Sequence, residues 1–215
     1  MAHLHRRGTA MQSKDHWEHV YASKAATSVS WYQPHATLSL DLIQRIGLGP
    51  EAAIIDVGGG ASTLVDDLAG RGYRDLTVLD LSGEALAIAR KRLGRAGERV
   101  RWMESDVTAA ALPARRFDVW HDRAVFHFLT QEPDRRAYVA QVMRAVKPGG
   151  HVIVATFAPD GPAECSGLPV LQYDAASLHG EFGSAFQLVE HDDEAHVTPA
   201  GRIQHFIYCH CITPH

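Results

Sequence analysis

Short apolar runs alternate with helix-like segments from residue 52 onward. A continuous run rich in β-branched residues predicts a strand buried on both faces, and such runs occupy residues 52–57, 75–81, 100–105, 117–121 and 151–157. Between them, apolar residues recur at helical spacing, with start signals at Ser62 or Thr63, at Ser82 and at Pro133, and with glycine stop signals, the last at 147–150. This alternation predicts a doubly wound, mostly parallel α/β sheet with helices on both faces.

The pattern changes after Phe157. A loop rich in Gly and Pro (158–169) and a short helix (174–180) precede two strand-like runs, residues 187–197 and 202–212. The turn residues Thr-Pro-Ala-Gly separate these runs, so we expect an antiparallel hairpin at the end of the sheet.

Charge and cysteine content exclude several classes of protein. A formal charge of −4 gives no general attraction to nucleic acid or to anionic membranes, and no apolar run approaches the roughly 18 residues of a membrane span. Three cysteines are too few for a disulfide framework, which favours a reducing cytoplasm. Residues 1–10 are polar and basic and are expected to form a flexible extension, with Met11 as a natural start.

Three consecutive glycines, Gly58 to Gly60, follow the first strand directly. In an open α/β sheet this turn lies where ligands bind, and glycine lets a ligand approach the main chain. The second strand ends in Asp80, where a carboxylate can accept both hydroxyls of a ribose. A dinucleotide site would need a third glycine where Thr63 stands, and a second βαβαβ half that the chain lacks. The two features therefore predict an adenosine-containing cofactor other than NAD.

With these motifs the chain resembles the class I S-adenosylmethionine-dependent methyltransferases over about residues 16–212. The stretch Ile-Ile-Asp-Val-Gly-Gly-Gly is similar to their first motif, with Asp56 before the glycines, and Leu-Asp-Leu-Ser is similar to the second, which implies that Asp80 and Leu81 meet the ribose. Glu-Ser-Asp-Val at 104–107 resembles the third motif. By this resemblance Asp106 accepts from the adenine amino group and the Val107 amide meets a ring nitrogen.

The resemblance also implies the strand order 3-2-1-4-5-7-6 with strand seven antiparallel, in agreement with the hairpin. It divides the remainder into an N-terminal helical cap (11–50), a cofactor-binding core (51–157) and a substrate-side loop with the C-terminal hairpin (158–215). A narrower similarity to thiopurine and thiol S-methyltransferases is carried by Trp-His-Asp-Arg at 120–123, where His121 shifts or interrupts the Trp-Asp-Arg of that branch.

Aromatic residues precede the core at Trp17, Tyr21 and Trp31. They are expected either to anchor the N-terminal helix by packing or to close over the sulfonium of the cofactor, whose charge is attracted by ring faces. Both roles are compatible, and a lid over residues 11–33 that orders with the ligand would be reasonable.

The residues that leave the fourth strand are the candidate catalytic groups. His121 is expected to act as a general base or to line the cofactor pocket, and Arg123 to orient an anionic substrate or to form an ion pair. His127 is expected to be a structural histidine, although a catalytic role is kept as an alternative.

Other clusters have plain explanations. Cys209 and Cys211 are expected to pack in a sheet, and no metal site is predicted. Cys165 could face a substrate, and the basic residues of the second helix are expected to be solvated.

The sequence thus predicts a cytoplasmic enzyme, monomeric or homodimeric, that transfers a methyl group from S-adenosylmethionine to a small molecule and releases S-adenosylhomocysteine. A sulfur or related soft nucleophile is the first choice of acceptor. The alternatives are a protein lysine or N-terminal methyltransferase and a cofactor-binding module without catalysis.

Overall fold

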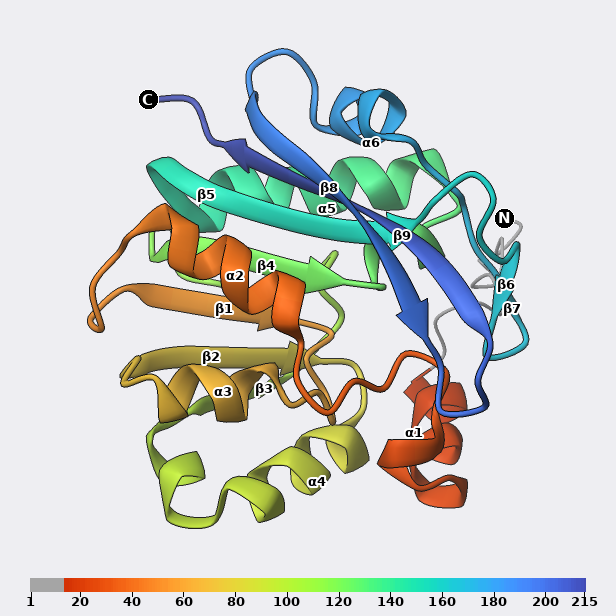
Figure 1. The fold of residues 1–215 in the computed structure, drawn as a ribbon. Coiled ribbons are helices and arrows are strands. Elements are labelled where there is room, and N and C mark those ends of the chain that lie inside the picture. The colour runs from red at the N-terminus through yellow and green to blue at the C-terminus, as the bar shows by residue number, and fades with distance from the viewer. Residues whose placement is uncertain (1–13) are drawn as a thin grey trace, which may run out of the picture.

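The apolar runs form a seven-stranded sheet in a computed structural model that describes residues 14–215 (Figure 1). The predicted extension 1–10 and Met11 lie outside these described residues. The strands are β1 (Ala53–Val57), β2 (Asp75–Asp80), β3 (Arg101–Glu104), β4 (Phe117–Arg123), β5 (Val146–Phe157), β8 (Gln187–Val197) and β9 (Ile203–Ile212). Their order is β3-β2-β1-β4-β5-β9-β8, with β9 antiparallel to both neighbours. The predicted topology is confirmed.

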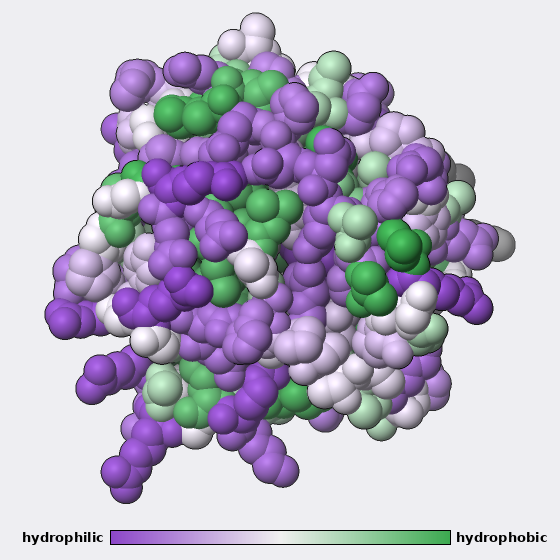
Figure 2. All heavy atoms as spheres, viewed as in Figure 1, coloured by the Kyte–Doolittle hydropathy of each residue, from purple (hydrophilic) through white to green (hydrophobic). Residues whose placement is uncertain are grey.

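Helices cover both faces of this sheet. They are α1 (Lys14–Ser23), α2 (Thr37–Ile46), α3 (Leu64–Gly70), α4 (Gly83–Leu93), α5 (Glu132–Ala145) and α6 (Ala175–Phe182), with short 3-10 turns η1 (Ala26–Ser28), η2 (Gly94–Arg99) and η3 (Phe126–Phe128). Helices α2, α3 and α4 contribute Leu40, Leu64 and Leu86 to one apolar core, whereas α5 and α6 contribute Val142 and Leu178 to the other. Hydrophilic residues surround several separate apolar patches on the outside of the α2–α4 face (Figure 2).

The carboxyl ends of β1, β2 and β4 point to one edge of the sheet, and α1 lies beside that edge (Figure 1). A small two-stranded sheet, β6 (Glu164–Cys165) with β7 (Leu168–Pro169), forms within the segment expected to be a plain loop. It lies at the same edge (Figure 1). This edge is therefore walled by elements from both ends of the chain.

The boundary between α5 and β5 differs from the sequence prediction. Helix α5 ends at Ala145, and β5 already begins at Val146, so the Lys-Pro-Gly-Gly stretch lies in the strand and not in a loop. Ser82 caps α4 as expected, its hydroxyl accepting from the amide of Ala85. At α3 the N-cap position is Thr63, one of the two residues predicted, but its hydroxyl makes no cap hydrogen bond and donates to the carbonyl of Gln33. The hydroxyl of Ser62, the other predicted residue, accepts from the amide of Leu64 at 3.1 Å.

Within the described part of the chain, none of the helices has the length and apolar character that crossing a membrane requires.

Candidate active site

Two adjoining cavities lie at the carboxyl edge of the sheet. The first, with about 730 Å³ of empty space, is bounded by Asp80 and Leu81 after β2 and by Asp106 and Val107 after β3. The second, with about 540 Å³, is bounded by Asp56, the glycine turn and His121. Four residues line both cavities: Tyr21, Trp31, Gly58 and Arg123. The two cavities therefore form one continuous site.

Side chains of the protein itself lie so close to the glycine turn that they leave no room for a Cβ atom there. A Cβ atom on Gly60 would lie 2.5 Å from the Asp80 Oδ2 atom, and one on Gly59 would lie 2.8 Å from the Val78 Cγ1 atom and still closer to the Asp56 carboxylate. At Gly58 it would overlap the side chain of Val125. Gly58 and Gly60 also have positive φ angles, of 67° and 27°, which side chains rarely adopt. The three glycines are therefore needed before any ligand is considered, and Gly60 itself lines neither cavity.

Asp80 ends β2 with one carboxylate oxygen, Oδ1, accepting from the amide of Ser82 at 2.8 Å. Burial, together with the nearby negative charge of Asp56, raises the pKa of Asp80 to about 7. A buried carboxylate of this kind is stabilised in its charged form by added hydrogen-bond donors. Such donors could be the hydroxyl groups of a ligand in the first cavity.

Asp106 follows β3 and lines the first cavity. Its Oδ1 atom accepts from both the amide and the hydroxyl of Thr108, at 2.8 and 2.7 Å. This turn fixes the carboxylate, and Leu81 and Val107 add apolar wall on either side of it. The arrangement suits a flat, partly apolar ring with a donor at its edge.

A chain of buried hydrogen bonds runs beneath the second cavity. The Asp56 Oδ1 atom lies 2.7 Å from His121 Nδ1, and His121 Nε2 lies 2.8 Å from the hydroxyl of Ser39 in α2. All three residues are buried, with at most 4% of their surface exposed. Both ring nitrogens of His121 are thus occupied by protein partners.

Arg123 is held by protein groups on several sides. Its guanidinium pairs with Glu194 of β8, with Nη2 and Oε2 3.0 Å apart, and donates through Nε to the hydroxyl of Tyr208 at 2.8 Å. A third hydrogen bond reaches the carbonyl of Trp31, and the ring of Phe206 lies 4.2 Å from the guanidinium carbon. The ion-pair role anticipated for Arg123 is present, which leaves its charge compensated beside the cavities.

The aromatic residues predicted to lie near the ligand form one cluster. The ring of Trp17 makes edge contacts with Trp31 and with Phe128, at centroid distances of 5.9 and 5.2 Å, and Tyr21 contacts Trp31 at 6.3 Å. All four rings line the first cavity, so both predicted roles, packing and closure over a ligand, remain compatible with their position.

Helix α1, which carries Trp17 and Tyr21, is held at the start of α4 by hydrogen bonds. The carboxylate of Glu18 accepts from the amides of Gly83 and Glu84, at 2.8 and 3.2 Å, and from the hydroxyl of Ser82. Lys14 adds an ion pair with Glu104 of β3. Since a carboxylate is favourable at a helix N-terminus, this contact holds the helix over the mouth of the site.

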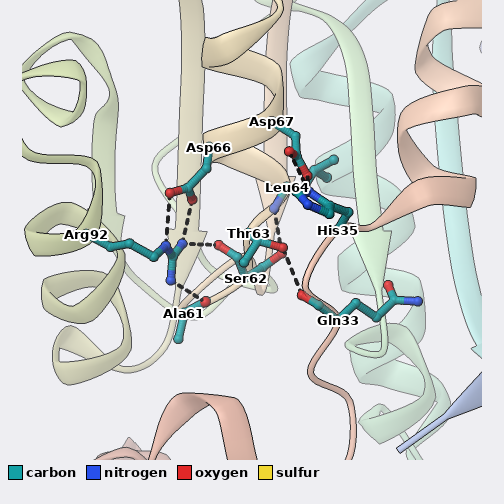
Figure 3. Close-up of polar contacts among 9 residues, drawn as sticks. All are labelled: Gln33, His35, Ala61, Ser62, Thr63, Leu64, Asp66, Asp67 and Arg92. Atoms are coloured by element: carbon teal, nitrogen blue, oxygen red, sulfur yellow. Dashed lines mark hydrogen bonds and ion pairs between the residues drawn. The ribbon is translucent and has the colours of Figure 1, made fainter.

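The segment 30–33 lies between α1 and α2, and side chains from three other elements bind its carbonyl groups. His196 donates to Ser30 at 2.7 Å, Arg123 to Trp31 at 3.1 Å, and Thr63 to Gln33 at 3.0 Å. Figure 3 shows the last of these hydrogen bonds, from Thr63 to the Gln33 carbonyl. We call residues 30–33 the strap, because they cross from the aromatic cluster to the glycine turn.

The residues that follow the glycine turn are also held by a side chain of α4 (Figure 3). Arg92 of α4 donates to the carbonyls of Ala61 and Ser62, at 2.9 and 2.6 Å, and forms a two-point ion pair with Asp66. The two bonds to carbonyls and the paired carboxylate fix the direction in which the turn enters α3.

Four further residues were singled out by the sequence. His127 is fully buried, and burial lowers its pKa to about 3, as a structural histidine requires. Cys165 lines the first cavity, and burial raises its pKa to about 11, so its thiol is neutral. Cys209 and Cys211 are buried free thiols in the core beside α6. Among residues 14–215, no cluster of three or more His, Cys, Asp or Glu side chains is arranged to hold a metal ion.

Sequence reasoning missed the residues that support the site from other elements. Ser39, Glu18, Glu194 and Tyr208 come from helices and strands far from the motifs, and no local pattern marks them. Arg92 was assigned to a solvated helix face, yet it binds the glycine turn.

Known proteins resemble this chain in sequence and in fold. Residues 54–150 match the family described as "Methyltransferase domain". A eEF1A lysine and N-terminal methyltransferase homolog of Drosophila melanogaster is 26% identical over 145 residues, which are 65% of this chain and 21% of that protein. A ubiquinone biosynthesis O-methyltransferase of Nitrosomonas europaea is 31% identical over 137 residues, 59% of this chain and 57% of the relative.

The chain thus spans about a fifth of the first of these relatives and less than two thirds of the second. Among solved structures, one described by the conversion of a disulfide bond into a thioacetal group during echinomycin biosynthesis superimposes with a TM-score of 0.76. The two sequences are 22% identical, and the match covers 94% of this chain and 93% of the other chain, which establishes a shared fold.

Proposed function

We propose that this chain is a class I S-adenosylmethionine-dependent methyltransferase, which binds S-adenosylmethionine across the two cavities and transfers its methyl group to a small-molecule nucleophile. The observation that carries the proposal is the joined site itself. Two fixed carboxylates, Asp80 and Asp106, lie along the first cavity, and a third, Asp56, lies beneath the second, with Gly58 at the junction.

The residues present fit this cofactor. Asp80 would accept from the ribose hydroxyls, and Asp106 with the Val107 amide would take the adenine edge, as the family resemblance implies. The Asp56 Oδ2 atom is buried and has no hydrogen-bond partner, which suits the positively charged amino group of a methionine tail. When bound, S-adenosylmethionine supplies an activated methyl group on a sulfonium, and the protein contributes alignment and exclusion of water.

A soft acceptor agrees with the groups that line the first cavity. Besides Asp80 and Asp106, its ionisable lining residues include Arg123, which is paired, and Cys165, which is neutral. An amine or hydroxyl acceptor needs a base, whereas a thiolate does not. The assignment of His121 as that base stays a prediction, because both of its nitrogens are already bonded within the protein.

Small-molecule methylation is the first choice because a ubiquinone biosynthesis O-methyltransferase is among the relatives. α1 and the strap also bring Trp17 and Trp31 to the wall of the first cavity. Similarity to eEF1A lysine and N-terminal methyltransferases favours a protein acceptor as the second candidate. The similarity to the thiopurine and thiol branch stays a prediction. The three free thiols agree with a reducing compartment, and we propose the cytoplasm.

The cofactor is tested by calorimetry with S-adenosylhomocysteine and, in parallel, NAD. We expect binding of the first and none of the second; the opposite result would overturn the assignment. The Asp80→Ala variant should bind S-adenosylhomocysteine more weakly by roughly 1.5–3 kcal/mol, because a charged hydrogen-bond acceptor is lost.

The acceptor is tested by a methyl-transfer screen over thiols, amines and carboxylates, with a peptide that carries lysine and a free N-terminus in the same screen. Turnover on a thiol would support the first choice, and turnover on the peptide alone would favour the second. Binding without turnover on any acceptor would favour a cofactor-binding module. In the same screen, full activity of His121→Ala on the best acceptor would exclude His121 as the base.

A further inference from the structure

Asp56 and His121 are neighbours because of strand register. β1 and β4 are parallel, and the two residues lie opposite one another in the sheet. Their side chains meet on the face that α2 covers, where Ser39 completes the chain of hydrogen bonds. The sheet and the helix thus fix all three side chains without any contribution from a flexible loop.

One oxygen of this arrangement is left over. The Oδ1 atom of Asp56 accepts a hydrogen bond from His121 Nδ1. The Oδ2 atom is buried and has no hydrogen-bond partner, and Asp56 lines the second cavity. A buried carboxylate oxygen without a donor is costly, so its retention points to a partner that arrives with a ligand. Gly59 lies directly over this carboxylate, because a Cβ atom there would overlap it.

The hydrogen-bond partners fix the imidazole from both sides. The carboxylate of Asp56 can only accept, so His121 Nδ1 carries the proton that is donated to it. His121 Nε2 lies 2.8 Å from the hydroxyl of Ser39, and this second hydrogen bond fixes the ring orientation from the other side. With the ring fixed, the carboxylate cannot rotate without losing its hydrogen bond at 2.7 Å.

We propose that Ser39 and His121 are positioning residues that fix the Asp56 carboxylate where it borders the second cavity, and that this makes the site selective for a ligand with a positively charged amino group. The inference rests on the proposed binding of S-adenosylmethionine and assigns to two further residues the recognition of its amino-acid end. His121 acts here through Asp56 and not on the methyl acceptor.

The same three residue types form the triad of serine hydrolases, but this geometry does not support such chemistry. Ser39 has no exposed surface, so its hydroxyl cannot reach a substrate. It lies on α2 behind His121, and the member of the chain with an unused atom is the carboxylate. The order of the residues in this series of hydrogen bonds therefore serves to orient Asp56.

The test measures selectivity with two probes: S-adenosylhomocysteine and its analogue that lacks only the α-amino group. The quantity of interest is the ratio of their dissociation constants by calorimetry. For the unmodified protein we expect the analogue to bind about 10- to 100-fold more weakly, as loss of a charged hydrogen bond predicts. Asp56→Asn should bring the ratio close to one.

Variants of the supporting residues separate positioning from general stability. His121→Leu should lower the ratio at least about five-fold, whereas His121→Asn, whose amide can replace the Nδ1–H donor, should retain most of it. Ser39→Ala should lower it about three-fold. Thr77→Val is the matched control, since Thr77 is a buried residue of β2 whose hydroxyl has no partner and which lines neither cavity. Its ratio should equal that of the unmodified protein.

Each outcome is decisive. If the unmodified protein does not bind S-adenosylhomocysteine, the proposed function fails. If it binds both probes equally, the proposed function stands and the amino-group assignment is overturned. If Asp56→Asn abolishes selectivity while Ser39→Ala and His121→Leu keep it, the positioning role is overturned. Should His121→Leu fail to fold, Ser39→Ala and His121→Asn still decide the question.

Discussion

Arg123 and Glu194 form an ion pair that joins the centre of the sheet to its last strand. The side chains are 8% and 14% exposed, and the Nη2 and Oε2 atoms lie 3.0 Å apart. The other oxygen of Glu194 accepts from the side chain of Gln33 at 2.5 Å, and Arg123 also binds the Trp31 carbonyl. One ion pair therefore connects β4, β8 and the strap beside the cavities.

Removing one partner of this pair should destabilise the fold. Glu194→Gln leaves the Arg123 charge without compensation in a largely buried place, and we expect a loss of about 3 kcal/mol in the free energy of unfolding by urea. Asp192→Asn is the control, because Asp192 of the same strand pairs with the half-exposed Arg45 and should cost less than about 1 kcal/mol. Equal losses in the two variants would show that the charge of Arg123 is satisfied elsewhere.

Cofactor affinity should depend on pH through Asp80. Its pKa of about 7 means that the carboxyl is protonated below neutral pH, and only the charged form accepts two hydroxyl hydrogens. Affinity for S-adenosylhomocysteine should therefore be lost as the pH falls, to about ten-fold weaker at pH 6 than at pH 8. Calorimetry at a series of pH values measures this.

The variant Asp80→Asn separates this effect from a second buried carboxyl. Burial also raises the pKa of Asp122 to about 7, but Asp122 is hydrogen-bonded to Tyr138 and to the amides of Val125 and Phe126, and lines neither cavity. Weak binding of Asp80→Asn that no longer varies between pH 6 and 8 would assign the dependence to Asp80. A persistent slope would assign it to Asp122.

The hydroxyl of Thr63 should contribute to ligand affinity by holding the strap. Thr63→Val removes the hydrogen bond to the Gln33 carbonyl, which is worth about 1 kcal/mol, so S-adenosylhomocysteine should bind about five-fold more weakly. Thr63→Ser keeps the hydroxyl and should bind as the unmodified protein does. Identical affinities for the Val and Ser variants would contradict a role for this bond.

Glu18 should control how firmly α1 is docked. Glu18→Ala removes the acceptor for the amides at the start of α4, and we expect proteolysis within residues 14–28 to become about ten-fold faster. Asp15→Ala, at an exposed position of the same helix, is the control and should be cleaved at the original rate. If a ligand orders this helix, S-adenosylhomocysteine should slow cleavage in the unmodified protein.

The sheet was predictable because its information is local. Each buried strand is a continuous apolar run, and each crossover contains its own start and stop signals, so the positions of β1 to β5 along the chain and the hairpin of β8 and β9 follow from patterns a few residues long. The order of the strands in the sheet was implied by the family resemblance. The boundary at Val146 was missed because Lys-Pro-Gly-Gly at 147–150 is typical of a helix stop, yet β5 runs through it.

The site was predictable where a motif lies at the end of a strand, as for Asp80 and Asp106, and where aromatic residues precede the core, as for Trp17 and Trp31. The structure places all four in the first cavity. The partners of His121 and Arg123 could not be found, because Ser39 and Glu194 are 82 and 71 residues distant in sequence from the side chains they bind. Such contacts depend on packing between elements, which short patterns do not encode.

The crowding at the glycine turn links these positions in evolution as well as in space. The room for a Cβ atom at Gly60 is taken by the Asp80 carboxylate, and at Gly59 by that of Asp56. A homologue that lost Asp80 could admit alanine in place of Gly60 where the positive φ angle relaxes, whereas one that lost Asp56 would also need a smaller residue than Val78 before Gly59 could change. We therefore expect the two acids and the two glycines to be inherited as pairs, so that paired changes in related sequences would report whether the carboxylates still occupy the turn.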